Sequence, residues 1–171
     1  MGVKKYLAID LGAESGRGIL GEFNGEKIKI KEIHRFPTYN TNVFSHIFWD
    51  VLKIFDEIKI ILKKTKEEGE ISGVGVTTWG VDCAYIGGGN LLLSNPFHYR
   101  DSRTDGIMEE VFSIIPKKEI FEKTGIQFMP INTLYQLHST KKEFPYIINS
   151  TEKLLFMPDL FNFFLTGKKF S

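Results

Sequence analysis

The sequence predicts an α/β fold whose sheet is antiparallel on one side and parallel on the other, with a helical cap. Three observations predict it. The first 36 residues have the pattern of three β-strands joined by short turns. A long amphipathic segment then precedes a β-branched, glycine-spaced strand, and the pattern after Pro96 is mainly helical. A long helix between two strands that can pair in parallel implies a right-handed crossover.

The N-terminal third is expected to be a β-meander. The dipeptide Asn24-Gly25 between two apolar runs is a strong hairpin signal. The third strand alternates charged residues with Ile28 and Ile30, which is typical of a half-exposed strand. A polar loop rich in Thr and Asn follows. The expected strands and loop are Tyr6–Ile9, Arg17–Phe23, Lys27–Phe36 and Pro37–Ser45.

The middle of the chain is expected to be a helix followed by two strands. Asp50 can cap a helix that runs to about Glu68, and Gly69 is a natural C-terminal stop. Apolar residues at helical spacing form one face: Val51, Phe55, Ile58, Ile61 and Leu62. The expected strands are Ile71–Thr78, which is typical of a buried parallel strand, and Cys83–Ile86, which ends in the turn Gly87–Asn90.

Helical patterns dominate after Pro96. The segment His98–Asp105 is dense in polar and aromatic residues, and helices follow it. The aromatic run near the C-terminal end fits a buried helix, with a membrane or partner face as the minority alternative. The expected helices are Thr104–Ile115, Lys117–Lys123, Thr133–Lys142 and Asp159–Leu165.

Composition restricts the class of protein. The 171 residues are enough for one domain, 1–171, and 42% of them are hydrophobic, as in globular chains. The net charge of +1 indicates neither a nucleic-acid partner nor an anionic membrane. The single cysteine allows no internal disulfide, and no apolar run approaches the length of a membrane span. Without a signal-peptide pattern at the N-terminus, we expect a cytoplasmic protein.

The first candidate site is the turn between the first two strands. Asp10 ends a buried strand, small residues Gly12–Gly16 form the turn, and Arg17 begins the next strand. Backbone N–H groups in such a turn can surround phosphate oxygens. Asp10 would then lie within reach of a divalent metal or its waters, and Arg17 within reach of phosphate. The same residues also fit an ordinary hairpin turn.

The second candidate site is the segment Trp79–Asp82. Ligands gather at the carboxyl ends of parallel strands, so this segment and the Asp10–Arg17 turn are expected to be neighbours. Trp79 offers an aromatic wall, Gly80 a close backbone approach and Asp82 a carboxylate, which together suit a polyol. The alternative is that Trp79 belongs to the core and Asp82 caps a turn.

Other polar residues give weaker signals. Only four of the 22 basic residues are Arg, so Arg17 and Arg100 are candidates for bidentate contacts. The cluster Tyr99–Arg103 has a structural or substrate-side role, or contains a surface Arg–Asp pair. The four His residues have no metal-ligand spacing, and Cys83 is expected to pack in a strand.

Five motifs in this order resemble the N-terminal lobe of the FGGY carbohydrate kinases, with the rhamnulokinase group most similar. They are DLGAESGR, TTWGVD, YRDSRT, TGIQFMPINTLYQL and MPDLFNFFLTGK, and the resemblance covers Lys5 to Lys169. It implies a ribonuclease-H-like, actin-type ATPase domain. It also implies ATP-dependent phosphorylation of L-rhamnulose to L-rhamnulose 1-phosphate with Mg²⁺, or of another ketose or deoxy sugar. A non-catalytic sugar- or nucleotide-binding module is the alternative from another class.

The resemblance also implies roles for residues. Its nucleotide-phosphate segment matches Ala13, Glu14, Ser15, Gly16 and Arg17, and its metal-side carboxylate matches Asp10. Its sugar-contacting position matches Gly80, flanked by Trp79 and Asp82, and Arg100 is the further substrate-side candidate. Glu14 and Cys83 depart from the residues common in the family. The catalytic base and most adenosine contacts belong to a C-terminal lobe, so residues 1–171 alone are expected to be inactive.

Overall fold

The computed structural model describes residues 2–170, whose contacts group them into two units. Unit 1 comprises the chain up to Tyr39, Asp50–Gly80 and Met157–Phe170. Unit 2 comprises Asn40–Trp49 and Val81–Phe156. The described chain contains no helix that is both long and apolar enough to cross a membrane.

Unit 1 is built on a mixed sheet with the strand order β3-β2-β1-β6. β1 (Lys4–Leu11), β2 (Ser15–Phe23) and β3 (Ile28–Pro37) form the antiparallel meander, and β6 (Gly73–Thr77) pairs with β1 in parallel. The expected sheet, antiparallel on one side and parallel on the other, is therefore confirmed. In this register Asp10 lies opposite Arg17 on β2 and opposite Thr77 on β6.

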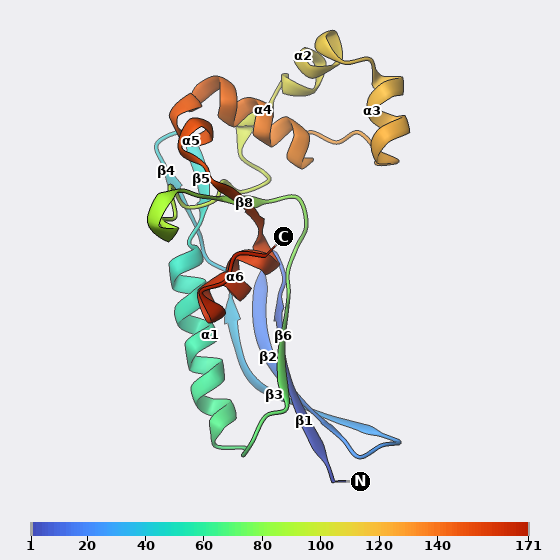
Figure 1. Ribbon diagram of the computed structural model, residues 1–171, viewed down its shortest axis with the longest axis vertical. Helices are drawn as coiled ribbons and strands as arrows, with labels where there is room; N and C mark the ends of the chain where they lie inside the picture. The colour runs from blue at the N-terminus through green and yellow to red at the C-terminus, as the bar shows by residue number, and fades with distance from the viewer. Residues whose placement is uncertain (1, 171) are drawn as a thin grey trace. The chain divides into compact units, whose positions relative to one another are not determined.

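One face of this sheet packs against α1 (Val51–Lys66), which Figure 1 shows running beside β3. The helix begins as expected, because the Asp50 side chain accepts a hydrogen bond from the Lys53 amide. A Cβ placed on Gly18 would lie 2.3 Å from Ile61, so the glycine allows helix and sheet to approach closely. α6 (Met157–Thr166) belongs to the same unit, and Phe164 packs edge-on against Phe55 at 5.2 Å.

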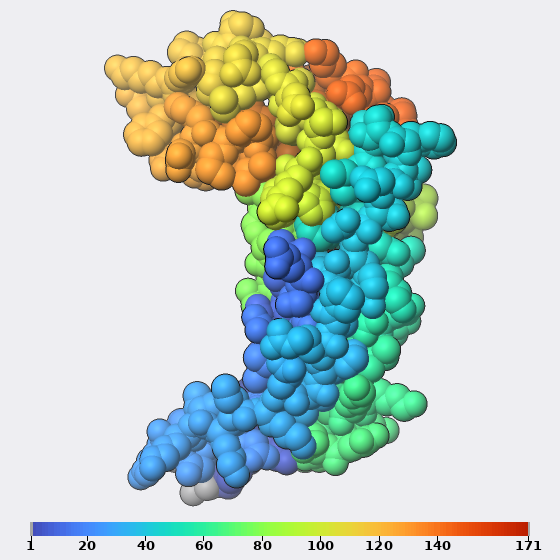
Figure 2. Space-filling view, turned by 180° about the vertical axis from the view of Figure 1, so that it is seen from behind, coloured from blue at the N-terminus to red at the C-terminus, as the bar shows by residue number. Residues whose placement is uncertain are grey.

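The other face of the sheet is largely bare within the described chain. Seen from behind, β1, β2 and β3 lie at the surface of unit 1 (Figure 2). Tyr6 is 45% exposed, Ile28 67% and Ile30 72%. The prediction that β3 is a half-exposed strand was therefore wrong for its first half, where all five residues are exposed within the described chain.

Unit 2 contains two small sheets and four α-helices. One sheet pairs β4 (Asn40–Val43) with β5 (His46–Trp49), and the other pairs β7 (Cys83–Ile86) with β8 (Lys153–Phe156), both antiparallel. The expected loop Pro37–Ser45 is thus partly a hairpin. The sequence did not predict its first strand, because that strand is short, rich in Asn and Thr, and has no apolar alternation. The helices are α2 (Ile107–Ile114), α3 (Lys117–Thr124), α4 (Thr133–Glu143) and α5 (Pro145–Ser150).

The cap helices were mostly predicted correctly. α3 and α4 lie where expected, whereas α2 begins at Ile107 because the residues before it form a 3₁₀ turn, η2 (Ser102–Thr104). One apolar cluster joins α2, α3 and α4 through Ile107, Val111, Ile120 and Tyr135. A second joins β7 to α5 through Cys83, Tyr85 and Ile147. Burial raises the pKa of the Cys83 thiol to about 12, which agrees with a packing role.

Candidate functional site

Asp10 and Arg17 form an ion pair across the β1–β2 hairpin. The Arg17 Nε donates to Asp10 Oδ2 at 2.8 Å, and Nη2 lies 2.7 Å from the same oxygen. The side chain of Arg17 is 35% exposed and that of Asp10 is 34% exposed. Arg17 therefore holds the carboxylate of Asp10 in place. Because both side chains still face solvent, each can also contact a ligand.

The turn between the two strands is fixed from both ends. The Gly12 amide donates to the Ser15 carbonyl at 2.9 Å. Thr38, just after β3, donates its hydroxyl to the Gly12 carbonyl at 2.6 Å and its amide to the Glu14 carbonyl at 3.0 Å. Thr38 was not among the residues predicted from the sequence, because a Thr within a polar loop gives no signal of this contact.

The turn has the features that a phosphate group requires. Within residues 2–170, the N–H groups of Ala13 and Glu14 donate to no protein acceptor. The Glu14 side chain is exposed, so its charge does not occupy the turn. Two amides beside the positive charge of Arg17 can donate to phosphate oxygens.

Asp10 fits a Mg²⁺ ion that is shared with phosphate. The described chain has no group of three or more acidic, His or Cys side chains that could hold a metal by themselves. Mg²⁺ in phosphate-binding sites is commonly held by one or two carboxylates together with waters and phosphate oxygens. A single carboxylate beside the turn therefore fits a Mg²⁺ ion that phosphate oxygens and waters also bind, rather than an ion held by protein groups alone.

Gly16 has a structural reason to be glycine. A Cβ at this position would lie 2.3 Å from Cζ of Phe36. Gly16 is buried under that ring, whereas Ala13 and Ser15 remain partly exposed. Of the predicted phosphate segment, Gly16 supports the shape of the hairpin, and the turn before it carries the groups that a ligand could reach.

Trp79 and Gly80 follow β6 at the sheet edge that carries Asp10. The parallel register places Thr77 opposite Asp10, so within unit 1 Trp79 and Gly80 follow the strand that pairs with the Asp10 strand, whereas Val81 and Asp82 belong to unit 2. Trp79 is half-buried. A Cβ at Gly80 would meet no atom within 4 Å, and its φ is not in the left-handed region. Neither packing nor backbone conformation within the described chain therefore requires glycine there.

Replacing Gly80 with Ala should change ligand binding and leave the fold unchanged. We expect the Tm of the full-length protein to stay within about 2 °C, because the added methyl meets open space. The resemblance implies a sugar contact at Gly80, where the methyl would occupy the space that a ligand needs, so we expect the KM for the sugar to rise at least about fivefold.

Gly75→Ala is the matched control, because a Cβ at Gly75, on β6, also meets no atom within 4 Å. It should leave the KM for the sugar unchanged. Steady-state kinetics that gave both variants the wild-type KM would remove Gly80 from the site.

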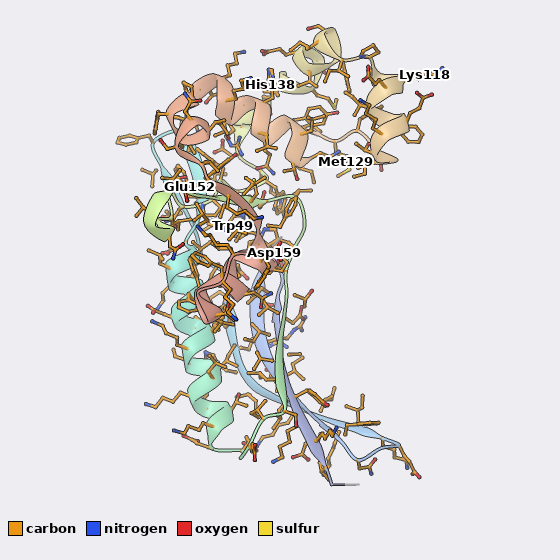
Figure 3. The ribbon with its side chains drawn as sticks, in the orientation of Figure 1. Trp49, Lys118, Met129, His138, Glu152 and Asp159 are labelled. Atoms are coloured by element: carbon orange, nitrogen blue, oxygen red, sulfur yellow. The ribbon has the colours of Figure 1, made fainter. Side chains whose placement is uncertain are left out.

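Asp82 belongs to unit 2 and is fully buried. Its Oδ2 accepts from the Trp49 indole N–H at 2.5 Å, and its Oδ1 accepts from the Gln136 side-chain amide at 2.8 Å. Trp49 comes from the end of β5 and is labelled in Figure 3. The carboxylate of Asp82 thus links two other segments of unit 2, and its observed contacts are with protein groups.

Arg103 lies at the centre of the same polar network. Its guanidinium donates to Gln136 Oε1 at 2.7 Å and to the Gln136 carbonyl at 2.8 Å, and it lies 4.3 Å from the centroid of Phe97. Its Nε is 3.8 Å from Asp101 Oδ1, within ion-pair distance but too far for a hydrogen bond. Asp101 and Arg103 are 3% and 7% exposed, so the alternative of a surface pair was wrong.

Arg100 differs from Arg103 in its surroundings. Its side chain is exposed and lies over the ring of Tyr99 at 5.4 Å. Burial, with a smaller contribution from the Arg100 charge, lowers the pKa of His98 to about 4, so this imidazole is neutral at pH 7. The neutral His98 accepts the Arg100 amide at Nδ1 and stacks on Trp49 at 4.0 Å.

Comparison with known proteins agrees with this geometry. Residues 5–171 match the model of the FGGY family of carbohydrate kinases, N-terminal domain. The rhamnulokinase of Halalkalibacterium halodurans is 45% identical over 164 residues, which cover 95% of this chain and 35% of that protein. The rhamnulokinase of Bacteroides thetaiotaomicron is 40% identical over 166 residues, covering 96% and 34%.

Solved structures of sugar kinases share the fold. The gluconate kinase of Lactobacillus acidophilus superposes with a TM-score of 0.84 at 20% identity, covering 98% of this chain and 34% of that one. The Plasmodium falciparum glycerol kinase with ADP gives a TM-score of 0.68 at 15% identity, covering 95% and 33%.

The chain belongs to the FGGY family of carbohydrate kinases, and its fold is that of their ribonuclease-H-like, actin-type N-terminal domain. It spans about a third of the length of the curated relatives that it matches.

Proposed function

We propose that this chain is the N-terminal lobe of an ATP-dependent sugar kinase whose full-length form phosphorylates L-rhamnulose to L-rhamnulose 1-phosphate. One observation carries the proposal beyond family membership. A turn whose Ala13 and Glu14 amides have no acceptor in the described part of the chain lies beside a carboxylate on β1, and the neighbouring parallel strand leads to Gly80, where packing requires no glycine. This arrangement supports one edge of the sheet as the place where a phosphate and a polyol bind.

The residues of the two segments have distinct roles in this proposal. The amides of Ala13 and Glu14 and the guanidinium of Arg17 bind phosphate oxygens of ATP, and Thr38 holds the turn. Asp10 orients Mg²⁺, which neutralises phosphate charge when bound. Trp79 and Gly80 contact the sugar, and Asp82 holds the segment that follows them. Arg100 is exposed and available to the substrate.

A second lobe completes the site in this proposal. Phosphoryl transfer depends on holding donor and acceptor in line, with a base that takes the proton of the sugar hydroxyl. We assign that base and most adenosine contacts to a C-terminal lobe, and we infer that residues 1–171 alone have no meaningful kinase activity. The bare apolar face with Tyr6, Ile28 and Ile30 is available for packing against further chain. A cytoplasmic location, where ATP is present, is part of the proposal.

A panel of acceptors tests the substrate. The full-length protein should phosphorylate L-rhamnulose with a higher kcat/KM than D-xylulose, gluconate or glycerol. The rhamnulokinase relatives at 40–45% identity support this order, whereas the gluconate and glycerol kinases are similar at no more than 20%. A higher kcat/KM for another ketose would replace L-rhamnulose while leaving a sugar kinase. Sugar or nucleotide binding without phosphorylation of any acceptor would favour the non-catalytic binding module.

A further inference from the structure

Val81 has a backbone conformation that its side chain disfavours. Its φ is +69°, and among residues 2–170 it is the one β-branched residue with a positive φ. The branched side chain crowds the backbone in this left-handed region, which Gly and Asn adopt far more readily. Strain of this kind persists only where surrounding contacts impose it, and it is concentrated in segments that bind ligands.

Two residues of α4 impose the conformation of the turn. The Thr133 hydroxyl donates to the Val81 carbonyl at 2.8 Å. The Gln136 side-chain amide donates to Asp82 Oδ1 at 2.8 Å and lies 3.4 Å from the Val81 carbonyl. These bonds hold the carbonyl of the Val81–Asp82 peptide and the Asp82 side chain from the same helix.

The side chain of Gln136 is itself fixed by hydrogen bonds to its neighbours. Gln136 is 2% exposed, and its Oε1 accepts from Arg103 Nη2 at 2.7 Å. Its amide also donates to the Ile131 carbonyl at 2.9 Å, so the rotamer is fixed at both ends. Val81 and Thr133 line a cavity of about 300 Å³ with Asn132 and Tyr135. The turn is thus bonded to α4 and borders open space.

We propose that Thr133 and Gln136 are positioning residues that keep the Val81–Asp82 turn in the conformation that binds the sugar acceptor. The inference rests on the proposed function, since Gly80 precedes this turn directly. Without the Thr133 hydroxyl, Val81 relaxes toward an ordinary φ, and the binding-competent conformation becomes a fraction of the population. The apparent affinity for the sugar then falls in proportion to that fraction, while the nucleotide turn on β1 is unaffected.

The test compares Thr133→Val with Thr133→Ser in the full-length protein. Valine has the shape of threonine without the donor, and serine restores the donor. Thr133 is half-buried, so both variants should fold with a Tm near that of the wild type. We expect Thr133→Val to raise the KM for L-rhamnulose about tenfold, with the KM for ATP within about twofold. Hydrogen exchange of the peptide covering residues 79–83 should be faster in this variant, and Thr133→Ser should restore both values.

Two results would overturn the inference. One is wild-type exchange of residues 79–83 and a wild-type KM for the sugar in Thr133→Val. The other is an equal rise of both KM values with a lowered Tm, which would indicate a general structural role. If the wild-type protein phosphorylates no sugar, the proposed function fails. The exchange rates of the two variants then still decide whether Thr133 holds the turn.

Discussion

Replacing Asp10 with Asn in the full-length protein is expected to lower kcat by about 100-fold or more, the size of effect seen when a group that stabilises transition-state charge is removed. The amide keeps the shape of the side chain and can still accept a hydrogen bond from Arg17. It removes the negative charge that would orient Mg²⁺ beside the phosphates. The loss should therefore appear in turnover and in the Mg²⁺ concentration needed for half-maximal rate.

The fold should tolerate this change. The Asp10–Arg17 pair is about a third exposed, and pairs of this kind contribute roughly 1 kcal/mol or less. Glu22→Gln is the matched control, because Glu22 pairs with Lys5 in the same sheet at 3.2 Å with a similar exposure of 35%. Glu22→Gln should leave kcat within about twofold of the wild type. Unchanged turnover and unchanged Mg²⁺ dependence in Asp10→Asn would remove Asp10 from the mechanism.

Replacing Arg103 with Met is expected to destabilise the fold by about 3 kcal/mol, the largest stability effect expected here. Methionine fills much of the volume but donates no hydrogen bond. The carbonyl and Oε1 of Gln136 and the hydroxyl of Thr140 then lose their shared donor within a buried network. Asp101 loses its neighbouring positive charge, although it keeps the Ile47 amide at 2.6 Å.

The thermal unfolding midpoint measures this effect. Arg100→Met is the matched control, because Arg100 is exposed and three residues away, so it should change stability by less than about 0.5 kcal/mol. The Arg103 variant should also raise the KM for the sugar, because Gln136 loses one of the contacts that fix it. Equal midpoints for the two variants would show that the buried network contributes little.

The sequence was sufficient for the sheet and the long helix because their signals are local. Asn24-Gly25 predicts the β2–β3 hairpin, and Asp50 caps α1 as expected. The order of elements predicted a parallel side of the sheet reached by a crossover helix, and the structure adds that the parallel partners are β1 and β6. Weak periodicity explains the failures: β4 consists of Asn, Thr and Val, and β8 is four residues long.

The candidate site was predictable only in part. Asp10 lies near the end of β1 and Gly80 follows β6, so reasoning from strand ends locates both residues. The contacts that Thr38, Thr133 and Gln136 make with the two candidate segments join residues 24 to 55 positions apart, which no local pattern encodes. The same holds for Arg103, because its burial follows from the packing of η2 against α4.

We propose that this chain supplies the phosphate- and sugar-binding half of a sugar kinase that needs a second lobe for transfer. ADP release with ATP, Mg²⁺ and L-rhamnulose tests it most directly, measured for the full-length protein and for residues 1–171 in parallel. We predict turnover at ordinary enzyme rates, about 1–100 s⁻¹, for the full-length protein and none above background for residues 1–171. Comparable turnover by residues 1–171 alone, or none by the full-length protein with any sugar, would contradict the account.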